Sequence, residues 1–168
     1  MGTRSLYEQV TELLSSNIPI TSFVDMDGVL AEYKYGEGKL ILDGDVGVYS
    51  SKRPIKTVIN FIAKYYDVNS NEFKILTSCI TKEQGKVKLE WIKRHMKFFN
   101  PKDFIYVLNK DFSTQRENKK VDIIMNHATE HPERKKILVI EDTHSILEKC
   151  WEKEPERILP VHVINLIK

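Results

Sequence analysis

Residues 20–28 read ITSFVDMDG, and in this stretch an apolar run from Ile20 to Val24 is followed at once by two aspartates and a glycine. A short apolar run bounded by turn residues is typical of a buried strand. In open parallel sheets, ligands bind just beyond the carboxyl ends of the strands. The stretch therefore predicts a core strand that ends in a functional loop from Asp25 to Gly28.

Further apolar runs follow along the chain and are separated by longer amphipathic stretches. We expect strands at 20–24, 73–76, 104–108, 137–140 and 161–164. We expect helices at 55–66, 83–98, 120–131 and 145–154, with an additional leading helix at about 5–15. Alternating strands and helices predict an α/β fold with a doubly wound, Rossmann-like parallel sheet of five strands. In the strand order 3-2-1-4-5, which many doubly wound sheets adopt, strands 2, 1 and 4 are neighbours.

One segment, at about 32–52, breaks this alternation because its glycines flank the short apolar run KLIL at 39–42. Such a pattern predicts a β-hairpin flap. The chain has 168 residues, which suits one compact domain over 1–168 and leaves no room for a second large one.

The composition is that of an ordinary globular protein. Its 26 basic and 24 acidic residues leave a formal charge of +2, which does not by itself indicate a nucleic-acid or membrane surface. A nucleic-acid partner and an oligomer both stay open. The sequence has no apolar run of membrane-spanning length and no secretory h-region, so we expect a cytoplasmic protein without a membrane partner. The two cysteines are too few for a disulfide framework, which fits a reducing compartment.

Polar side chains follow three of the expected strands. They are Asp25, Asp27 and Gly28 after the first, Thr77 and Ser78 after the second, and Glu141 and Asp142 after the fourth. If these strands are neighbours, four carboxylates share one pocket. Like charges so close raise one another's pKa unless a cation offsets them. Mg²⁺, a hard ion with oxygen ligands, is the expected cofactor, with Asp25, Asp27, Glu141 and Asp142 as candidate ligands.

This pocket has the residue types that phosphoryl transfer needs. A carboxylate such as Asp25 can attack phosphorus and form an acyl phosphate. Asp27, two residues later, can protonate the leaving oxygen and then activate water. Gly28 lets backbone N–H groups approach the phosphate, and the hydroxyl of Thr77 can donate a hydrogen bond to it.

A lysine should also hold the nucleophile and the phosphate together. Lys120 and its neighbour Lys119 begin the helix before the fourth strand, and Lys88 lies on the helix after Thr77. Lys120 is the first candidate, and the other two remain alternatives. Candidate substrate contacts are Gly28, Ser78, Lys88 and Arg53, with Tyr33 and Lys34 from the flap.

Four sequence segments resemble the four motifs of the haloacid dehalogenase-like superfamily, most of whose members are phosphatases with an aspartyl-phosphate intermediate. The segments are FVDMDGVLA at 23–31, ILTS at 75–78, a lysine before a helix, and VIEDT at 139–143. The resemblance spans about 20–165. Within the superfamily, DMDGVLA at 25–31 and KLEW at 88–91 are also similar to the 5′(3′)-deoxyribonucleotidases.

The resemblance implies a role for each matching residue. Asp25 would be the nucleophile and a metal ligand, and Asp27 the acid and base that also binds metal through its backbone carbonyl. Thr77 would bind phosphate, and Lys120 would be the lysine of the third motif. The fourth motif has Glu141 where Asp is commoner, which leaves open whether Glu141 or Asp142 contacts the metal. The short flap also departs from the helical cap of the deoxyribonucleotidases.

Two other chemistries fail on spacing. A thiol phosphatase with Cys79 as nucleophile would need an arginine where Gly85 stands. We therefore expect Cys79 and Cys150 to be packing residues. The pair His127 and His131 has the spacing of a helical zinc site but lacks the accompanying glutamate, so we expect exposed histidines at a helix end.

The sequence thus predicts a Mg²⁺-dependent phosphomonoester hydrolase that forms phospho-Asp25. Its substrate would be a phosphorylated compound, with nucleotides or nucleic-acid ends as candidates. A small flap leaves an open site, which has room for a nucleic-acid end, a phosphoprotein or a partner subunit. A phosphotransferase with the same intermediate and a non-catalytic binding module of the same fold are the alternatives.

Overall fold

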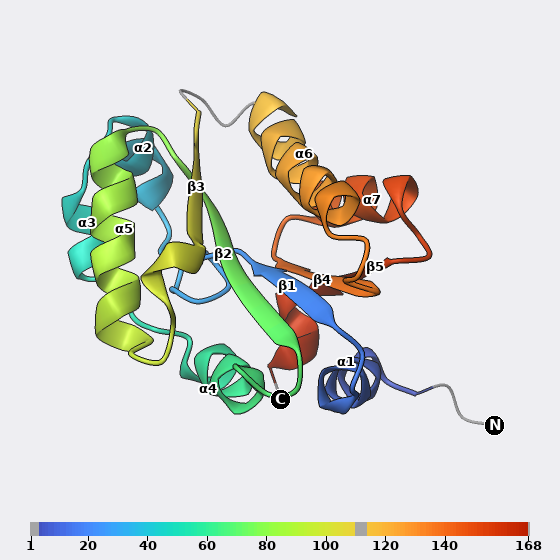
Figure 1. Ribbon diagram of the computed structural model, residues 1–168. Helices are drawn as coiled ribbons and strands as arrows, with labels where there is room; N and C mark the ends of the chain where they lie inside the picture. The colour runs from blue at the N-terminus through green and yellow to red at the C-terminus, as the bar shows by residue number, and fades with distance from the viewer. Residues whose placement is uncertain (1–3, 110–113, 168) are drawn as a thin grey trace.

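A computed structural model describes residues 4–109 and 114–167 of the chain (Figure 1). Five parallel strands form one sheet in the order β3-β2-β1-β4-β5. Their bounds are β1 Ile20–Val24, β2 Asn71–Cys79, β3 Phe104–Leu108, β4 Lys136–Glu141 and β5 Ile158–His162. The predicted α/β class, the parallel sheet and the order 3-2-1-4-5 are confirmed.

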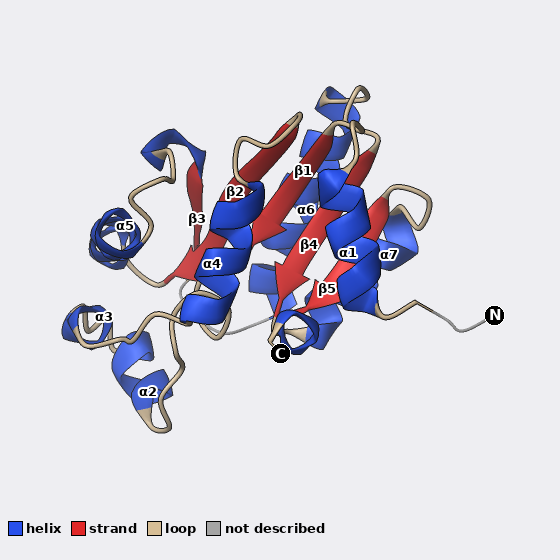
Figure 2. Cartoon of the chain, turned by 90° about the horizontal axis from the view of Figure 1, so that it is seen from below, coloured by secondary structure: helices blue, strands red, loops and turns tan. Residues whose placement is uncertain are grey.

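Helices cover both faces of this sheet (Figure 2). The α-helices are α1 Leu6–Ser15, α2 Glu37–Leu42, α3 Gly47–Ser50, α4 Lys56–Tyr65, α5 Lys82–His95, α6 Thr114–Glu130 and α7 His144–Lys153, and the short 3₁₀ helices are η1 Pro101–Asp103 and η2 Val163–Leu166. One buried cluster joins side chains of α1, α4 and α5 to the sheet. A second cluster joins those of α6 and α7 to the opposite face. Helices therefore shield both faces of the sheet from solvent, as a doubly wound fold requires.

The first strand lies at the centre of the sheet and is buried along its whole length. Val24 is opposite Ile75 of β2 on one side and Ile140 of β4 on the other. Asp25 follows β1 and Asp142 follows β4 at the same edge of the sheet, whereas β2 continues past Ile75 to Cys79. Thr77 and Ser78, which we expected after the second strand, therefore lie inside β2, near its carboxyl end. This register brings the carboxyl ends of β1, β2 and β4 together.

The last strand begins earlier than the sequence predicts. We expected residues 161–164, whereas β5 is Ile158–His162 and η2 follows it. Ile158 pairs with Ile137 of β4 and is buried. Val163 and Leu166, three residues apart, are buried on the face of α1 and α4. Their spacing fits a 3₁₀ turn, in which residues i and i+3 share a side.

The flap is helical, so the β-hairpin prediction is wrong. It consists of α2 and α3, and Gly36 and Gly44 on either side of α2 have φ angles of +87° and +81°. Glu37 and Ile41, four residues apart, are buried while Lys39 between them is exposed, which is the burial period of a helix and not of a strand. The run KLIL is too short for its periodicity to separate the two.

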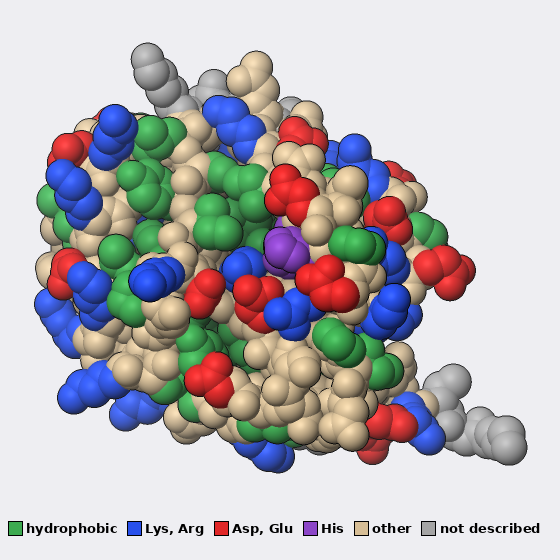
Figure 3. Space-filling model, in the orientation of Figure 1, with side chains coloured by type: hydrophobic (Ala, Val, Ile, Leu, Met, Phe, Trp, Pro, Cys, Tyr) green, Lys and Arg blue, Asp and Glu red, His purple; other side chains and the backbone are tan. Residues whose placement is uncertain are grey.

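Hydrophobic side chains reach the surface between α5 and α6, where the edge strand β3 lies (Figure 3). Tyr106 and Leu108 of β3 are 37% and 39% exposed. Basic and acidic side chains both occur across this face, in keeping with the nearly balanced composition (Figure 3). In the described part of the chain, no helix combines the length and apolarity needed to cross a membrane.

Candidate active site

The loop after β1 turns sharply and is held by its own backbone. The N–H of Gly28 donates to the carbonyl of Ala31 at 2.8 Å, and the N–H groups of Leu30 and Ala31 both donate to the carbonyl of Met26 at 2.9 Å. Gly28 has a φ of +79°, and a Cβ there would lie 2.1 Å from Oδ2 of Asp142. Only glycine fits on both counts. The loop is thus shaped to receive the carboxylate of Asp142.

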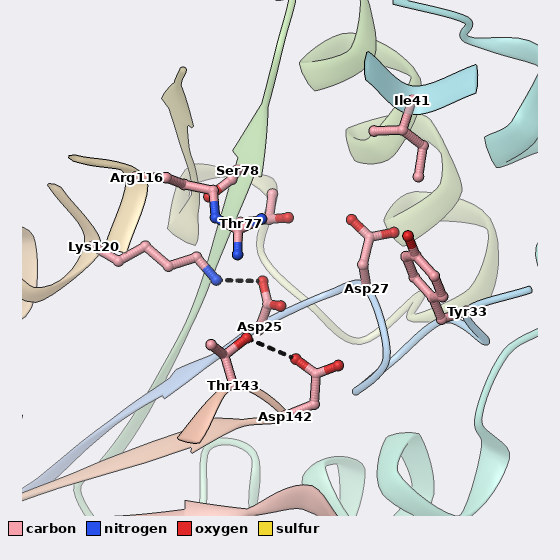
Figure 4. A pocket seen from close by; sticks show the side chains of 10 residues that line it. All are labelled: Asp25, Asp27, Tyr33, Ile41, Thr77, Ser78, Arg116, Lys120, Asp142 and Thr143. Carbon is pink, nitrogen blue, oxygen red and sulfur yellow. Dashed lines mark hydrogen bonds and ion pairs between the residues drawn. The ribbon is translucent and has the colours of Figure 1, made fainter. Parts of the chain in front are cut away.

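Asp25 lies at the carboxyl end of β1, and the structure brings Lys120 to it (Figure 4). The Nζ atom of Lys120 is 2.8 Å from Oδ1 of Asp25 and 2.8 Å from Oε2 of Glu141. All three side chains are less than a tenth exposed. Burial, and next the nearby charge of Glu141, raise the pKa of Asp25 to about 7, while Lys120 opposes the shift. Asp25 therefore lies in a site that is short of positive charge.

The alternative lysines lie in two different places. Lys119 is exposed and donates to the carbonyl of Leu108 at 3.0 Å, which directs it away from Asp25. Lys88 is buried below the site. It donates to Oγ1 of Thr77 at 2.8 Å, to the carbonyl of Ser78 at 2.7 Å and to Oδ2 of Asp27. These three bonds use all three N–H donors of an ammonium. Lys88 is thus placed to orient other side chains and not to contact a substrate, contrary to our expectation.

Asp27 has a different environment from Asp25, although it is two residues away. Its carboxylate contacts Lys88 through Oδ2 and Lys52, at 3.2 Å, through Oδ1. Burial alone would raise the pKa of Asp27, but Lys88 and Lys52 outweigh it and hold that pKa below its ordinary value. Asp27 is therefore ionised at neutral pH.

Lys52 is a site residue that the sequence did not indicate. It is 3% exposed, and its ammonium also contacts Oε2 of Glu37 in α2 at 2.8 Å and the carbonyl of Glu32 at 3.2 Å. The indole N–H of Trp91 in α5 donates to the carbonyl of Lys52 at 3.0 Å. Its neighbour Arg53, which we predicted as a substrate contact, is exposed and does not line the cavity. No sequence motif separates these two neighbouring cations.

Three carboxylates can hold a cation together. Oxygens of Asp25, Glu141 and Asp142 all lie within 4.8 Å of one another. Hard oxygen donors at this spacing suit Mg²⁺, and the missing Cβ of Gly28 leaves room for Asp142. The side chain of Asp27 is not in this group because two lysines hold it. A metal contact through the backbone carbonyl of Asp27 stays a prediction.

A cavity of about 320 Å³ opens above Asp25 (Figure 4). Its lining residues are Asp25, Asp27, Tyr33, Ile41, Thr77, Ser78, Arg116, Lys120, Asp142 and Thr143. Asp142 lines it and Glu141 does not; both carboxylate oxygens of Glu141 accept hydrogen bonds, from Lys120 and from the N–H of Asp142. This arrangement favours Asp142 as the acid that faces a bound ligand. The sequence did not indicate Arg116 or Thr143.

The predictions for cysteine and histidine have different outcomes. Cys79 and Cys150 are free and buried, and burial raises the pKa of their thiols to about 11 and about 12. They pack as expected and are poor nucleophiles. The prediction of an exposed His127 is wrong, since its Nε2 atom lies 3.0 Å from Oγ1 of Thr21 and its ring packs edge-on against Phe23.

Comparison of the chain with protein-family models and with curated proteins gave no match. The assignment of a function therefore depends on the residues and their geometry.

Proposed function

We propose that the chain is a Mg²⁺-dependent phosphomonoester hydrolase of the haloacid dehalogenase-like superfamily, acting through a phosphoryl group on Asp25. One observation carries the proposal. Two aspartates of one loop face the same cavity in opposite electrostatic environments, one beside a group of carboxylates and the other between two lysines. This is the division of labour that a nucleophile and an acid and base require.

The contacts of Asp25 support its role as nucleophile. It is fixed from below by Lys120, whose other partner is Glu141, so one carboxylate oxygen is held while the other is available to attack. The hydroxyl of Thr77 accepts a hydrogen bond from Lys88, which leaves its own proton to donate into the cavity. A phosphoryl group above Asp25 would meet this donor and Lys120.

The contacts of Asp27 support its role as acid and base. An ionised carboxylate is ready to accept a proton from the water that hydrolyses the acyl phosphate. A substrate phosphate beside Asp27 adds negative charge, which raises the pKa of Asp27 and favours the proton that the leaving oxygen needs. Lys88 and Lys52 fix the direction of the carboxylate through both steps.

Asp25, Asp142 and Glu141 would hold the metal ion. A bound Mg²⁺ supplies charge that offsets the phosphoryl oxygens as the carboxylate approaches them. Lys120 keeps Glu141 and Asp25 in place for this ion. The Gly28 loop keeps the carboxylate of Asp142 at the edge of the cavity.

Hydrolysis is the proposed reaction, with Asp27 as the base that activates water, and transfer to another acceptor is the alternative. Nucleotides and nucleic-acid ends are the proposed substrates, and the cytoplasm is the proposed location. The flap residues Tyr33 and Ile41 form the wall that a leaving group would meet.

The test is phosphate release from p-nitrophenyl phosphate, from nucleoside monophosphates and from oligonucleotides with a terminal phosphate, with and without Mg²⁺. The wild-type protein should release phosphate only with Mg²⁺, and Asp25→Asn should lower turnover by about 10⁴-fold. The exposed Asp43→Asn serves as a matched control and should equal wild type. Equal turnover by Asp25→Asn and wild type would refute the nucleophile. Adding alcohols as acceptors separates transfer from hydrolysis.

A further inference from the structure

Arg116 lies four residues before Lys120 on α6, which places the two side chains on the same face of the helix. Lys120 contacts Asp25 and Glu141 at the bottom of the cavity. This face of α6 therefore looks onto the candidate active site. Because Arg116 and Lys120 lie on the same face of α6, the helix that brings Lys120 to Asp25 also brings Arg116 to the cavity.

The side chain of Arg116 lines the cavity together with those of Thr77, Ser78 and Lys120 (Figure 4). Arg116 and Lys120 are the two basic residues that line the cavity among the residues described. The other lysines of the site, Lys88 and Lys52, are 1% and 3% exposed and lie behind Asp27.

The chemistry of the proposed reaction needs a donor with several N–H groups here. Lys120 already gives two of its three N–H donors to Asp25 and Glu141. A guanidinium has five donors in a planar fork that matches two phosphate oxygens at once. In phosphoryl transfer, negative charge is spread over the three non-bridging oxygens in the transition state.

We propose that Arg116 is a further catalytic residue, whose guanidinium binds two non-bridging oxygens of the phosphoryl group as it moves onto Asp25 and off again. The proposal rests on the proposed function. In the first step Asp25 forms an O–P bond, the bond from phosphorus to the leaving oxygen breaks, and that oxygen takes the proton of Asp27. In the second step water attacks phosphorus, Asp27 takes its proton, and the Asp25–phosphorus bond breaks to release phosphate. Arg116 keeps its protons throughout.

The experiment compares Arg116→Met and Arg116→Lys with wild type in Mg²⁺, using p-nitrophenyl phosphate and the best substrate of the phosphate-release panel. We expect kcat/KM to fall by about 10²–10³-fold in Arg116→Met, the loss seen when one donor to a developing negative charge is removed. Arg116→Lys should recover only part of it, because an ammonium lacks the fork. Arg94→Met, an exposed arginine on α5, is the matched control and should equal wild type.

Two readouts separate a catalytic from a structural role. Added guanidinium chloride at low, non-denaturing concentration should restore activity to Arg116→Met but not to Asp25→Asn. Orthovanadate, which imitates the phosphoryl group in transit, should inhibit Arg116→Met far more weakly than wild type, while thermal unfolding of the two proteins stays the same.

An Arg116→Met protein that folds and keeps kcat/KM within about threefold of wild type would overturn the inference while leaving the proposed function intact. So would equal inhibition by vanadate. If the wild-type protein releases no phosphate from any substrate of the panel, the proposed function itself fails and the role of Arg116 fails with it.

Discussion

Asp25 and Asp27 belong to one loop, but the residues around them differ in charge. Around Asp25, the three carboxylates that lie within 4.8 Å of one another share a single ammonium, that of Lys120. Around Asp27, two carboxylates, its own and that of Glu37, are matched by Lys88 and Lys52. The Asp27 side is balanced by the protein alone. The Asp25 side keeps an excess of negative charge even when the cavity-lining Arg116 is counted with Lys120, and a bound Mg²⁺ would offset that excess.

The opposite pKa shifts follow from this difference. Burial and then Glu141 raise the pKa of Asp25 to about 7. Burial acts in the same direction on Asp27, but Lys88 and then Lys52 reverse its effect and lower that pKa. The loop thus divides the cavity into a side that needs a cation and a side that already has its cations.

The largest effect should come from removing the acid and base. We expect Asp27→Asn to lower turnover of an alkyl phosphate by about 10²–10⁴-fold, because neither the leaving oxygen nor the water then has a proton partner. The aryloxide that leaves an aryl phosphate does not need a proton, so the first step of that substrate should be less affected. The check is kcat/KM for both substrates in Mg²⁺, because kcat/KM reports the first step and not the later release of phosphate. An equal loss for the two would contradict the role of Asp27 as the acid of the first step.

Next comes the lysine that orients both Asp27 and Thr77. Lys88→Met leaves Asp27 without its main partner, and breaking such a buried pair costs about 3–5 kcal/mol of unfolding free energy. The exposed Lys93→Met on the same helix is the matched control and should change stability by less than about 0.5 kcal/mol. Urea unfolding measures both. A Lys88→Met protein as stable and active as the control would show that Lys88 has no positioning role.

The third effect is a dependence of stability on pH that Mg²⁺ should remove. Without metal, the native protein holds the proton of Asp25 up to about pH 7, whereas the ordinary pKa is 3.8. This contribution to stability is full below pH 3.8 and is lost as pH rises through 7, a loss of up to about 4 kcal/mol at 1.4 kcal/mol per unit. The Asp25→Asn protein has no carboxyl group at this position, so its stability should not fall in this way as pH rises.

The measurement is thermal unfolding of wild type and Asp25→Asn between pH 5 and 8, with and without Mg²⁺. The advantage of Asp25→Asn should grow with pH in the absence of metal and shrink when Mg²⁺ is added. Asp43→Asn should follow wild type at every pH. A constant difference between wild type and Asp25→Asn across this range would contradict the charge excess around Asp25.

The sequence was enough to predict those site residues whose positions are determined by the sheet. Asp25 and Asp142 each follow a strand and Thr77 lies near the carboxyl end of β2, and parallel strands bring such residues to one edge whatever the rest of the chain does. Lys120 could be predicted for the same reason, since its helix leads into β4. The strand order itself was an assumption about topology that the structure confirmed.

The surroundings of Asp27 could not be predicted from the sequence, because contacts between distant segments form them. Lys52 becomes a site residue only when α2 and α3 fold against α5, where the Gln84 side chain donates to the carbonyl of Ile41 at 2.8 Å. The prediction for α2 was wrong for the same reason, because Glu37 is buried against Lys52, a contact that the local sequence does not indicate. Arg116 carries no motif of its own.

The most direct test of the central claim is to trap the phosphorylated enzyme. Wild-type protein is mixed with Mg²⁺ and p-nitrophenyl phosphate, quenched in acid within the first turnover, and digested for peptide mass spectrometry. The division of the cavity predicts one phosphoryl group on Asp25, more of it in Asp27→Asn because release is slowed, and none in Asp25→Asn or without Mg²⁺. Phosphate release without any phosphorylated Asp25, or a phosphoryl group on another residue, would contradict the account.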